Sequence, residues 1–446
     1  MARADRPALM PAATDGPPGA AAARRAVEAV WRIESARIVG ALARYTGDFA
    51  LAEDVAQEAL AEALVGWARD GAPASPVGWL LATARRRAID AFRRASALDE
   101  RYAALAGPLA EGEFSTGAAG TPAPPPELPF DPDRVDDDVL ALMFTACHPV
   151  LSPEARVALT LRVVGGLSSE EIARAFLVPV PTVQARITRA KKTIAAAHVP
   201  FELPPPQERR ARLGAVLSVL YVIFTEGSTA TAGEDLLRPD LAYEAVRLAR
   251  MLAALLPAEP EVHGQLALFE LTASRFPART GPDGEAVLLE DQDRRRWDHS
   301  AIRRGLAALG RAAALGRGLG PYGLQAAIAA CHAAAPSVAD TDWERIVLLY
   351  EALGRVAPSP VVELNRAVAV AMADGPLPAL SLVDDLAVSG RLAGSHLLPG
   401  VRGELLVRLG RTTEARAELE LAARLCRNVR ERAVLLRKAA ALGSGA

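Results

Sequence analysis

Residues 163–194 carry the feature that most constrains the fold, because they predict two short helices joined by a tight turn. Ser168, followed three residues later by Glu171, is a capping box, which satisfies free backbone amides at a helix start. Pro179 and Pro181 end that helix and open the next, since proline fits a first turn but not a helix interior. We therefore expect a helix-turn-helix over these residues.

The second helix of this pair is basic. Between Ile172 and His198 every charged residue is positive, for a segment charge of +5: Arg174, Arg186, Arg189, Lys191 and Lys192. A positioning helix followed by a basic helix is how many proteins present side chains to the major groove of DNA. An ordinary helical hairpin with a solvated basic face fits the same pattern, so the charge alone leaves both interpretations open.

The composition limits how the chain could reach nucleic acid. Its 446 residues carry a net charge of −2, so any such contact must come from local basic patches. Hydrophobic residues make up 51% of the chain and aromatic residues only 5%, and alanine is abundant, which favours closely packed helices. No stretch of any length alternates apolar and polar residues as a strand does. We expect an all-α protein of roughly two to four domains.

Breaks rich in proline divide the chain. The run Gly-Thr-Pro-Ala-Pro-Pro-Pro-Glu, which precedes the helix-turn-helix, predicts a flexible linker. A second break, Pro204–Pro206, precedes a long remainder rich in alanine and leucine. The expected order is a disordered tail, a first helical domain, the linker, the helix-turn-helix domain and a helical C-terminal domain: 1–23, 24–98, 99–134, 135–200 and 207–446.

The C-terminal segment shows a weak internal repeat. Small-residue turns at Gly375 and Gly410 lie 35 positions apart. That spacing is close to the tetratricopeptide period of about 34 residues. Helix pairs of this kind stack into a solenoid whose concave surface binds a peptide or another protein. We therefore predict a tetratricopeptide-like domain of helical hairpins.

Two opposed charge patches share the first domain. Residues 45–68 contain five acidic and no basic side chains, and Asp54, Glu58 and Glu62 are spaced to line one helix face. Repulsion at this spacing suggests a basic partner, although a solvated acidic helix fits as well. The next helix reverses the sign, with a net charge of +4 over Arg85–Arg94. Its flanking aromatic residues suit stacking on unpaired bases, and a solvated surface helix is the alternative.

With these segments in view, the chain resembles the extracytoplasmic-function (ECF) sigma factors of bacterial RNA polymerase. Ala52-Glu-Asp-Val-Ala-Gln-Glu resembles their core-binding helix, and Trp79-Leu-Leu-Ala-Thr-Ala-Arg-Arg-Arg-Ala-Ile-Asp resembles their −10-reading helix. Thr182-Val-Gln-Ala-Arg-Ile-Thr-Arg-Ala-Lys-Lys resembles their −35 recognition helix. Three motifs in this order are far more specific than any one alone. Pro179 and Pro181 depart from the small or polar residues that are commoner before that helix.

The resemblance implies two partners, RNA polymerase core and promoter DNA. On core polymerase, the β′ clamp helices and the β flap are the implied contacts. The residues implied to bind core are Asp54, Gln57 and Glu58. Those implied at the −10 element are Arg85, Arg86, Arg87, Asp90, Arg93 and Arg94. Those implied at the −35 element are Thr182, Gln184, Arg186 and Arg189 for base edges and Lys191 and Lys192 for phosphates.

The C-terminal segment resembles the ECF subgroup that carries a fused helical-repeat extension. The similar stretches are Leu289-Glu-Asp-Gln-Asp-Arg-Arg-Arg-Trp, Gln325-Ala-Ala-Ile-Ala-Ala-Cys-His and Asp374-Gly-Pro-Leu. We expect this domain to modulate sigma activity through a protein partner or an intramolecular one. Asp374, Gly375 and Pro376 are the expected regulatory contact, and a plain helix–helix turn explains these three residues equally well.

The sequence predicts no enzyme, no cofactor and no metal site. Cys147-His148 and Cys331-His332 lack second pairs with ligand spacing, so core positions explain them better. The glycines of 316–323 follow no strand, which argues against a nucleotide-binding loop. No apolar run reaches the ~18 residues that a membrane span needs. We expect a cytoplasmic protein with no membrane partner.

Two other functions fit parts of the sequence. A conventional helix-turn-helix regulator with a helical sensor domain would bind promoter DNA without polymerase, but it leaves the acidic helix unexplained. A helical-repeat interaction adaptor would use the N-terminal half only for docking, and its DNA binding would be absent or insensitive to salt.

Overall fold

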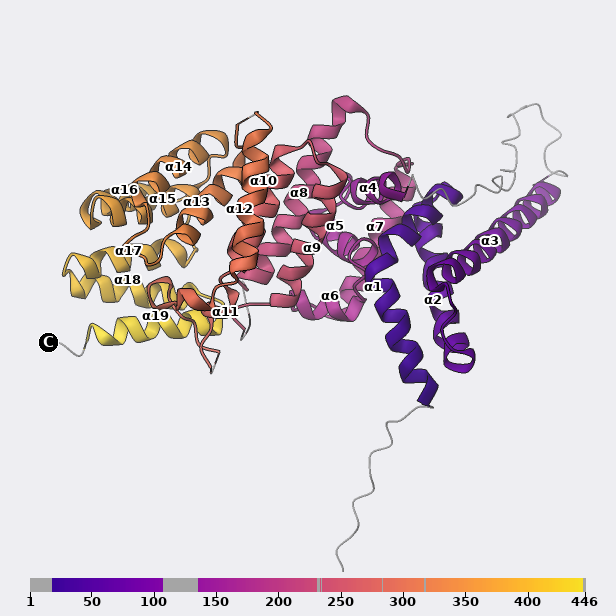
Figure 1. The fold of residues 1–446 in the computed structure, drawn as a ribbon, viewed down its shortest axis with the longest axis horizontal. Helices are drawn as coiled ribbons and strands as arrows, with labels where there is room; N and C mark the ends of the chain where they lie inside the picture. The colour runs from indigo at the N-terminus through magenta and orange to yellow at the C-terminus, as the bar shows by residue number, and fades with distance from the viewer. Residues whose placement is uncertain are drawn as a thin grey trace, which may run out of the picture. The chain divides into compact units, whose positions relative to one another are not determined.

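The computed structural model shows a chain built from helices (Figure 1). Within the part of the chain that the structure describes, the only strand-like pairings are two isolated β-bridges, which confirms the all-α class. The expected linker lies outside the described residues from 107 onward, and the expected tail lies outside them up to residue 17. The described residues are 18–106, 135–230, 233, 235–282, 284–316 and 318–443.

Packing divides the chain into two compact units. The N-terminal unit comprises Met1–Ser168 and Ala185–Pro205. The C-terminal unit comprises Ser169–Gln184 and Pro206–Ala446. The division runs through the helix-turn-helix, so these units differ from the sequence-based domain boundaries.

Three long helices open the N-terminal unit: α1 (Pro18–Thr46), α2 (Phe49–Asp70) and α3 (Pro76–Ala106). α1 begins six residues before the expected Arg24, because the alanines at 20–23 favour a helix. Asp48 caps α2, since its carboxylate accepts hydrogen bonds from two backbone amides at 2.7 and 3.1 Å. α2 and α3 meet at an edge-to-face pair of Trp67 and Trp79, whose ring centroids are 5.7 Å apart.

The chain after residue 134 packs onto the same unit. Its helices here are α4 (Val135–Ala146), α5 (Pro153–Val163) and the second part of α7 (Val180–Ala196). α4 lies against α1, where Gly40 allows a close approach, because a Cβ there would be only 3.1 Å from the backbone of Asp138. An ion pair of 3.3 Å between Arg44 and Asp138 closes the same contact. The segments on either side of residues 107–134 therefore form one packed body.

The helix-turn-helix forms as the sequence predicts. α6 (Ser169–Phe176) begins directly after Ser168, at the predicted capping position. Leu177 then takes a left-handed φ of 50°, which turns the chain out of the helix. Pro179 precedes α7 and Pro181 lies in its first turn, where proline's missing amide costs no hydrogen bond.

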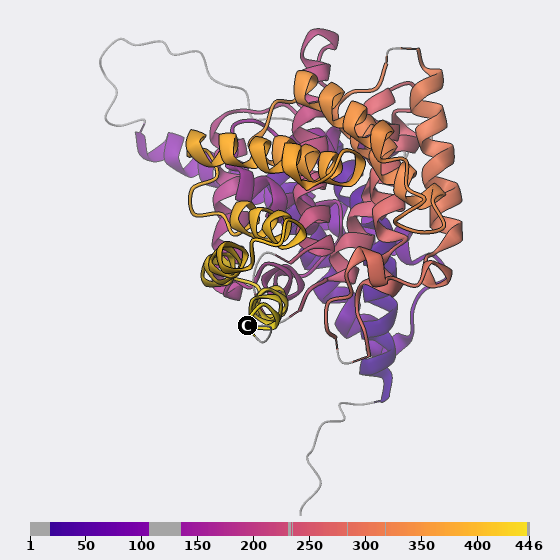
Figure 2. The same ribbon diagram turned by 90° about the vertical axis from the view of Figure 1, so that its left-hand side faces the viewer.

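Helical hairpins make up the C-terminal unit (Figures 1 and 2). The helices are α8 (Pro206–Ser228), α9 (Pro239–Leu255), α10 (Pro260–Ala273), α11 (Phe276–Arg279), α12 (His299–Ala314), α13 (Pro321–Ala334), α14 (Trp343–Val356), α15 (Pro360–Ala373), α16 (Pro376–Ser389), α17 (Leu397–Arg408), α18 (Thr412–Leu425) and α19 (Val429–Ala441). Short 3₁₀ turns, η3 (Leu289–Asp291) and η4 (Arg294–Arg296), lie between α11 and α12. Most helices pack on their neighbour in the chain. The unit is helical as expected, and its tetratricopeptide-like character stays a prediction.

Small residues set the spacing of these helices. A Cβ on Gly264 of α10 would lie 2.7 Å from the backbone nitrogen of Gly323 in α13. Only glycine allows this approach, so the two helix backbones touch directly. An alanine-rich chain with few aromatic residues gains its packing in this way.

One helix, α8, is long and apolar enough to qualify as a membrane span by length and composition. This differs from the expectation that the chain has no apolar run long enough to span a membrane. Half of its most apolar window is buried inside the protein, and α8 packs on α9 and α10. A core helix of a helical domain has these same properties.

Candidate functional site

The N-terminal half of α2 is in contact with two basic side chains, one from α5 and one from α7. Glu53 is 4% exposed. Its carboxylate accepts a 2.7 Å hydrogen bond from Lys191 Nζ of α7 and lies 3.5 Å from Arg162 Nε of α5. Lys191 Nζ also lies 2.5 Å from Asp54 Oδ1, and Arg162 Nη2 donates to Gln57 Oε1 at 2.7 Å. We call these five residues the Glu53 cluster.

The charges of the Glu53 cluster are matched. Burial alone would lower the pKa of Lys191, but the Glu53 and Asp54 carboxylates outweigh it and raise the pKa. The lysine is therefore fully charged at neutral pH. Two cations facing two carboxylates and one amide hold α5 and α7 against α2.

The structure separates the three residues expected to bind core polymerase. Asp54 and Gln57 belong to the Glu53 cluster, whereas Glu58 lies 3.7 Å from Arg87 of α3. Sequence reasoning missed Glu53 and Arg162. A signal for Glu53 was present in the sequence. Phe49, Ala56 and Leu60 lie four residues before it and three and seven residues after it, which places Glu53 on the apolar stripe of the helix.

The residues expected at the −10 element line α3. Arg85 stacks over the ring of Tyr45 at 5.6 Å, and Arg87 hydrogen-bonds to Glu62 of α2. The remaining four are exposed, and the Arg93 and Asp90 side chains pair weakly at 3.9 Å: Arg86, Asp90, Arg93 and Arg94. The exposed part of the patch is therefore the end of α3 that lies beyond Arg85.

The residues expected at the −35 element divide between the sides of α7. A buried stripe faces the protein: Val183, Ile187, Ala190 and Ile194. Gln184, Arg189 and Lys192 are exposed, and Thr182 and Arg186 are half-buried. Lys191 differs from its neighbour Lys192, because it points at the carboxylates of α2.

The expected regulatory turn joins α15 to α16. Asp374 ends α15, Pro376 begins α16, and Gly375 between them has a φ of 96°. This φ needs glycine, so the turn explains these three residues without a regulatory role. The exposed Asp374 side chain stays a candidate contact.

Three residues distant in sequence could ligate a metal ion. The ligand atoms of His396, Cys426 and Glu431 lie within 4.8 Å of one another. No spacing motif links the members of this group, so it could not be predicted from the sequence. The His396 imidazole contacts the Glu431 carboxylate at 3.1 Å, and burial raises the pKa of the Cys426 thiol. Cys147 is buried, and its sulfur contacts the Thr160 hydroxyl at 3.3 Å, as a core residue does.

Comparisons with known proteins match this arrangement. The family described as sigma-70 region 2 matches residues 32–97, and sigma-70 region 4 matches 141–194. A family of unknown function, DUF6596, matches 212–313. No solved structure matches the chain.

Two relatives extend these matches. The chain is 44% identical over 410 residues to the uncharacterized protein R00370 of Rhizobium meliloti, across 89% of this chain and 91% of that protein. It is 29% identical over 188 residues to the probable ECF RNA polymerase sigma factor SigI of two Mycobacterium tuberculosis strains. That match covers 41% of this chain and 59% of SigI, so the chain spans less than two thirds of that relative.

Regions 2 and 4 on helical domains define the class of sigma-70 factors, whose partners are RNA polymerase core and promoter DNA. The chain belongs to one family with the Rhizobium protein. It carries sigma-70 regions 2 and 4, is similar to an ECF sigma factor over part of its length, and has a helical C-terminal extension.

Proposed function

We propose that this protein binds RNA polymerase core through α2, holds the −10 element with α3 and reads the −35 element with α7. It thereby directs transcription from particular promoters, and its C-terminal unit modulates that activity. The observation that supports this most is the pair of opposed faces within region 2. α2 exposes Asp54 and Glu58, which suit a basic protein surface, and α3 exposes Arg86, Arg93 and Arg94, which suit DNA.

The Glu53 cluster adds a conformational requirement. Core polymerase cannot pair with Asp54 and Gln57 while Lys191 and Arg162 occupy them. We infer that the described conformation is closed, with region 4 covering part of the core-binding face. Binding to core then requires α7 to leave α2, which also frees Lys191 for DNA phosphate. Such coupling between two states is typically worth about 1–3 kcal/mol.

The test is transcription in vitro with purified protein, sigma-free core polymerase and the gene's own upstream DNA. We expect specific transcripts from the wild type and at least tenfold fewer from the double variant Asp54→Ala, Glu58→Ala. The matched control is Asp70→Ala, on the same helix, because Asp70 is exposed and pairs with its exposed neighbour Arg69. No transcript from any variant, with DNA binding intact in the absence of core, would favour a conventional regulator.

The modulatory role has its own readout in this assay. Asp374→Ala should change the transcript level if the turn is a regulatory contact. An unchanged level, together with an unchanged melting temperature, assigns these residues to the helix–helix turn alone.

A further inference from the structure

Three arginines of the C-terminal unit meet around one tryptophan. Arg275 and Arg279 flank α11, Arg294 begins η4, and Trp297 ends that turn. His332 of α13 lies beside them. We call Arg275, Arg279, Arg294 and His332 the arginine cluster. All four are half-buried, and Trp297 is 4% exposed. These residues include parts of two stretches that the proposed sigma activity leaves without a role.

The contacts of the cluster are neutral. The Arg294 guanidinium lies 4.1 Å from the centre of the Trp297 ring and donates to the backbone oxygen of His332 at 2.7 Å. Arg275 lies 5.3 Å from the same ring and donates to Gln292 Oε1 at 3.3 Å. Arg279 donates to the backbone oxygen of Ser228 at 2.6 Å. Over the described ranges, none of the three arginines has a carboxylate within ion-pair distance.

The like charges act on one another. Burial, and then the charges of Arg279 and Arg294, lower the pKa of Arg275 to about 10. Burial, and then Arg275 and Arg294, lower the pKa of His332 to about 4. A carboxylate, Glu431, is near enough to act only on Arg279, where it partly offsets the burial that lowers the pKa. The cluster thus holds three positive charges with little counter-charge from the chain.

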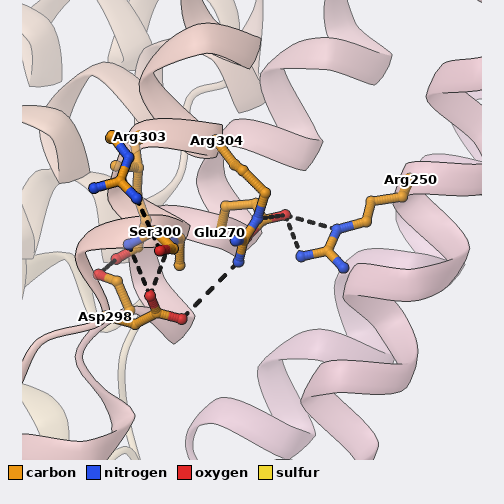
Figure 3. A network of polar contacts seen from close by, with 9 residues as sticks. Arg250, Glu270, Asp298, Ser300, Arg303 and Arg304 are labelled. Atoms are coloured by element: carbon orange, nitrogen blue, oxygen red, sulfur yellow. Dashed lines mark hydrogen bonds and ion pairs between the residues drawn. The ribbon is translucent and has the colours of Figure 1, made fainter.

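A second arginine group in the same unit shows the usual arrangement (Figure 3). Glu270 is 2% exposed and its carboxylate lies 2.6 Å from Arg250 and 3.0 Å from Arg304. Arg304 also approaches Asp298 at 3.9 Å. Here the chain supplies carboxylates to its own arginines. The arginine cluster therefore does not reflect a shortage of acidic residues in the unit.

Three residues of this region also carry polar atoms that make no hydrogen bond to the described part of the chain. Arg294 Nη2, Trp297 Nε1 and His332 Nδ1 are buried and have no hydrogen-bond partner among the residues that the structure describes. Two of these atoms are donors in any state, and the neutral imidazole carries one further N–H on either nitrogen. Buried donors without acceptors are rare in native proteins, and an absent ligand is one explanation for them.

We propose that the arginine cluster binds a small anion through a carboxylate or phosphate group, held by Arg275 and Arg294 beside the Trp297 indole. A guanidinium presents paired N–H donors that fit both kinds of oxyanion, and Arg294 Nη2 is unused. The anion supplies the missing counter-charge and accepts hydrogen bonds from the buried donors. The site lies wholly in the C-terminal unit, so its binding does not depend on the sigma function proposed above.

The test uses the full-length chain with inorganic phosphate and with acetate as probes, at constant ionic strength set with chloride. We expect phosphate, acetate or both to raise the melting temperature of the wild type in a saturable manner. Arg294→Met and Arg275→Met should each weaken this binding by tenfold or more. The matched control, Arg303→Met, replaces an exposed arginine of α12 that hydrogen-bonds to Ser300, and it should bind as the wild type does (Figure 3).

A second measurement needs no variant. An anion at the cluster favours the charged imidazole, so the bound probe should raise the pKa of His332 in an NMR titration of the wild type. A response to phosphate alone identifies a phosphate site, and a response to acetate alone identifies a carboxylate site. Absence of binding by both probes, or equal binding by the Arg294→Met and Arg303→Met variants, overturns the proposal.

Discussion

The Glu53 cluster and the arginine cluster both place several cations in half-buried positions, but only the first has matching carboxylates. Lys191 and Arg162 face Glu53 and Asp54, which come from another helix of the same chain. Arg275 and Arg294 face a tryptophan ring, an amide and a backbone oxygen. The two regions thus differ in where the counter-charge comes from.

This difference separates two uses of buried charge. A matched cluster holds two helices in one arrangement. When the helices separate, each charge loses its partner, so such a cluster suits a switch between two conformations. An unmatched cluster is unfavourable by itself, so any anion that enters it stabilises the fold by mass action. The Glu53 cluster is of the first kind, and the arginine cluster is of the second. The predictions below change the charge of each cluster in turn.

The largest effect, on the free energy of unfolding, is expected when His332 of the arginine cluster becomes protonated. His332 has a pKa of about 4 in the folded chain against an ordinary 6.5. The unfolded chain therefore binds more protons between these values, and stability falls as the pH drops from 6.5 to 4. The loss should be on the order of 3 kcal/mol for this residue. Hydrogen exchange in α13 at several pH values measures it.

His332→Gln is the control for this pH dependence. It keeps a polar side chain but cannot become a cation, so the difference from the wild type isolates the histidine from carboxylates that titrate nearby. Parallel curves for the two proteins would show that His332 is not held neutral by its burial and its arginine neighbours.

The next effect comes from removing a cation from the matched cluster. Lys191→Ala leaves Glu53 and Asp54 with Arg162 alone, so α7 should leave α2 more readily. We expect core polymerase to bind this variant about tenfold more tightly, which corresponds to about 1.4 kcal/mol. Binding to core without DNA, followed by fluorescence anisotropy, measures it. Lys192→Ala is matched by position and charge but is exposed, and it should bind core as the wild type does. Equal affinities for the two variants would contradict the closed state.

The sequence predicted local structure well and contacts between distant residues poorly. Three features could be predicted because each depends on residues close together in the sequence. They are the capping box at Ser168, the two prolines at the start of α7 and the small-residue turn at Gly375. Lys191 and Glu53 lie 138 positions apart. The residues around Lys191 and Lys192 do not indicate which of the two lysines contacts α2.

The arginine cluster was hidden for a related reason. Its members come from α11, η4 and α13. Their side chains interact electrostatically only after these elements pack together. The stretches that contain Arg294 and His332 resemble the ECF subgroup with a helical extension, and that resemblance says nothing about their chemistry. Burial and missing acceptors, which turn that similarity into a binding hypothesis, exist only in the folded chain.

The smallest expected effect compares one arginine from each group of the C-terminal unit. Arg250→Met removes a partner of the buried Glu270 carboxylate and should lower the free energy of unfolding by about 1 kcal/mol, since Arg250 is 49% exposed. Arg294→Met loses a hydrogen bond and a ring contact but relieves repulsion, so its stability in phosphate-free buffer should match the wild type within about 0.5 kcal/mol. Chemical denaturation of both variants measures this. A loss at Arg294 as large as that at Arg250 would mean that the chain already balances the charge of the arginine cluster.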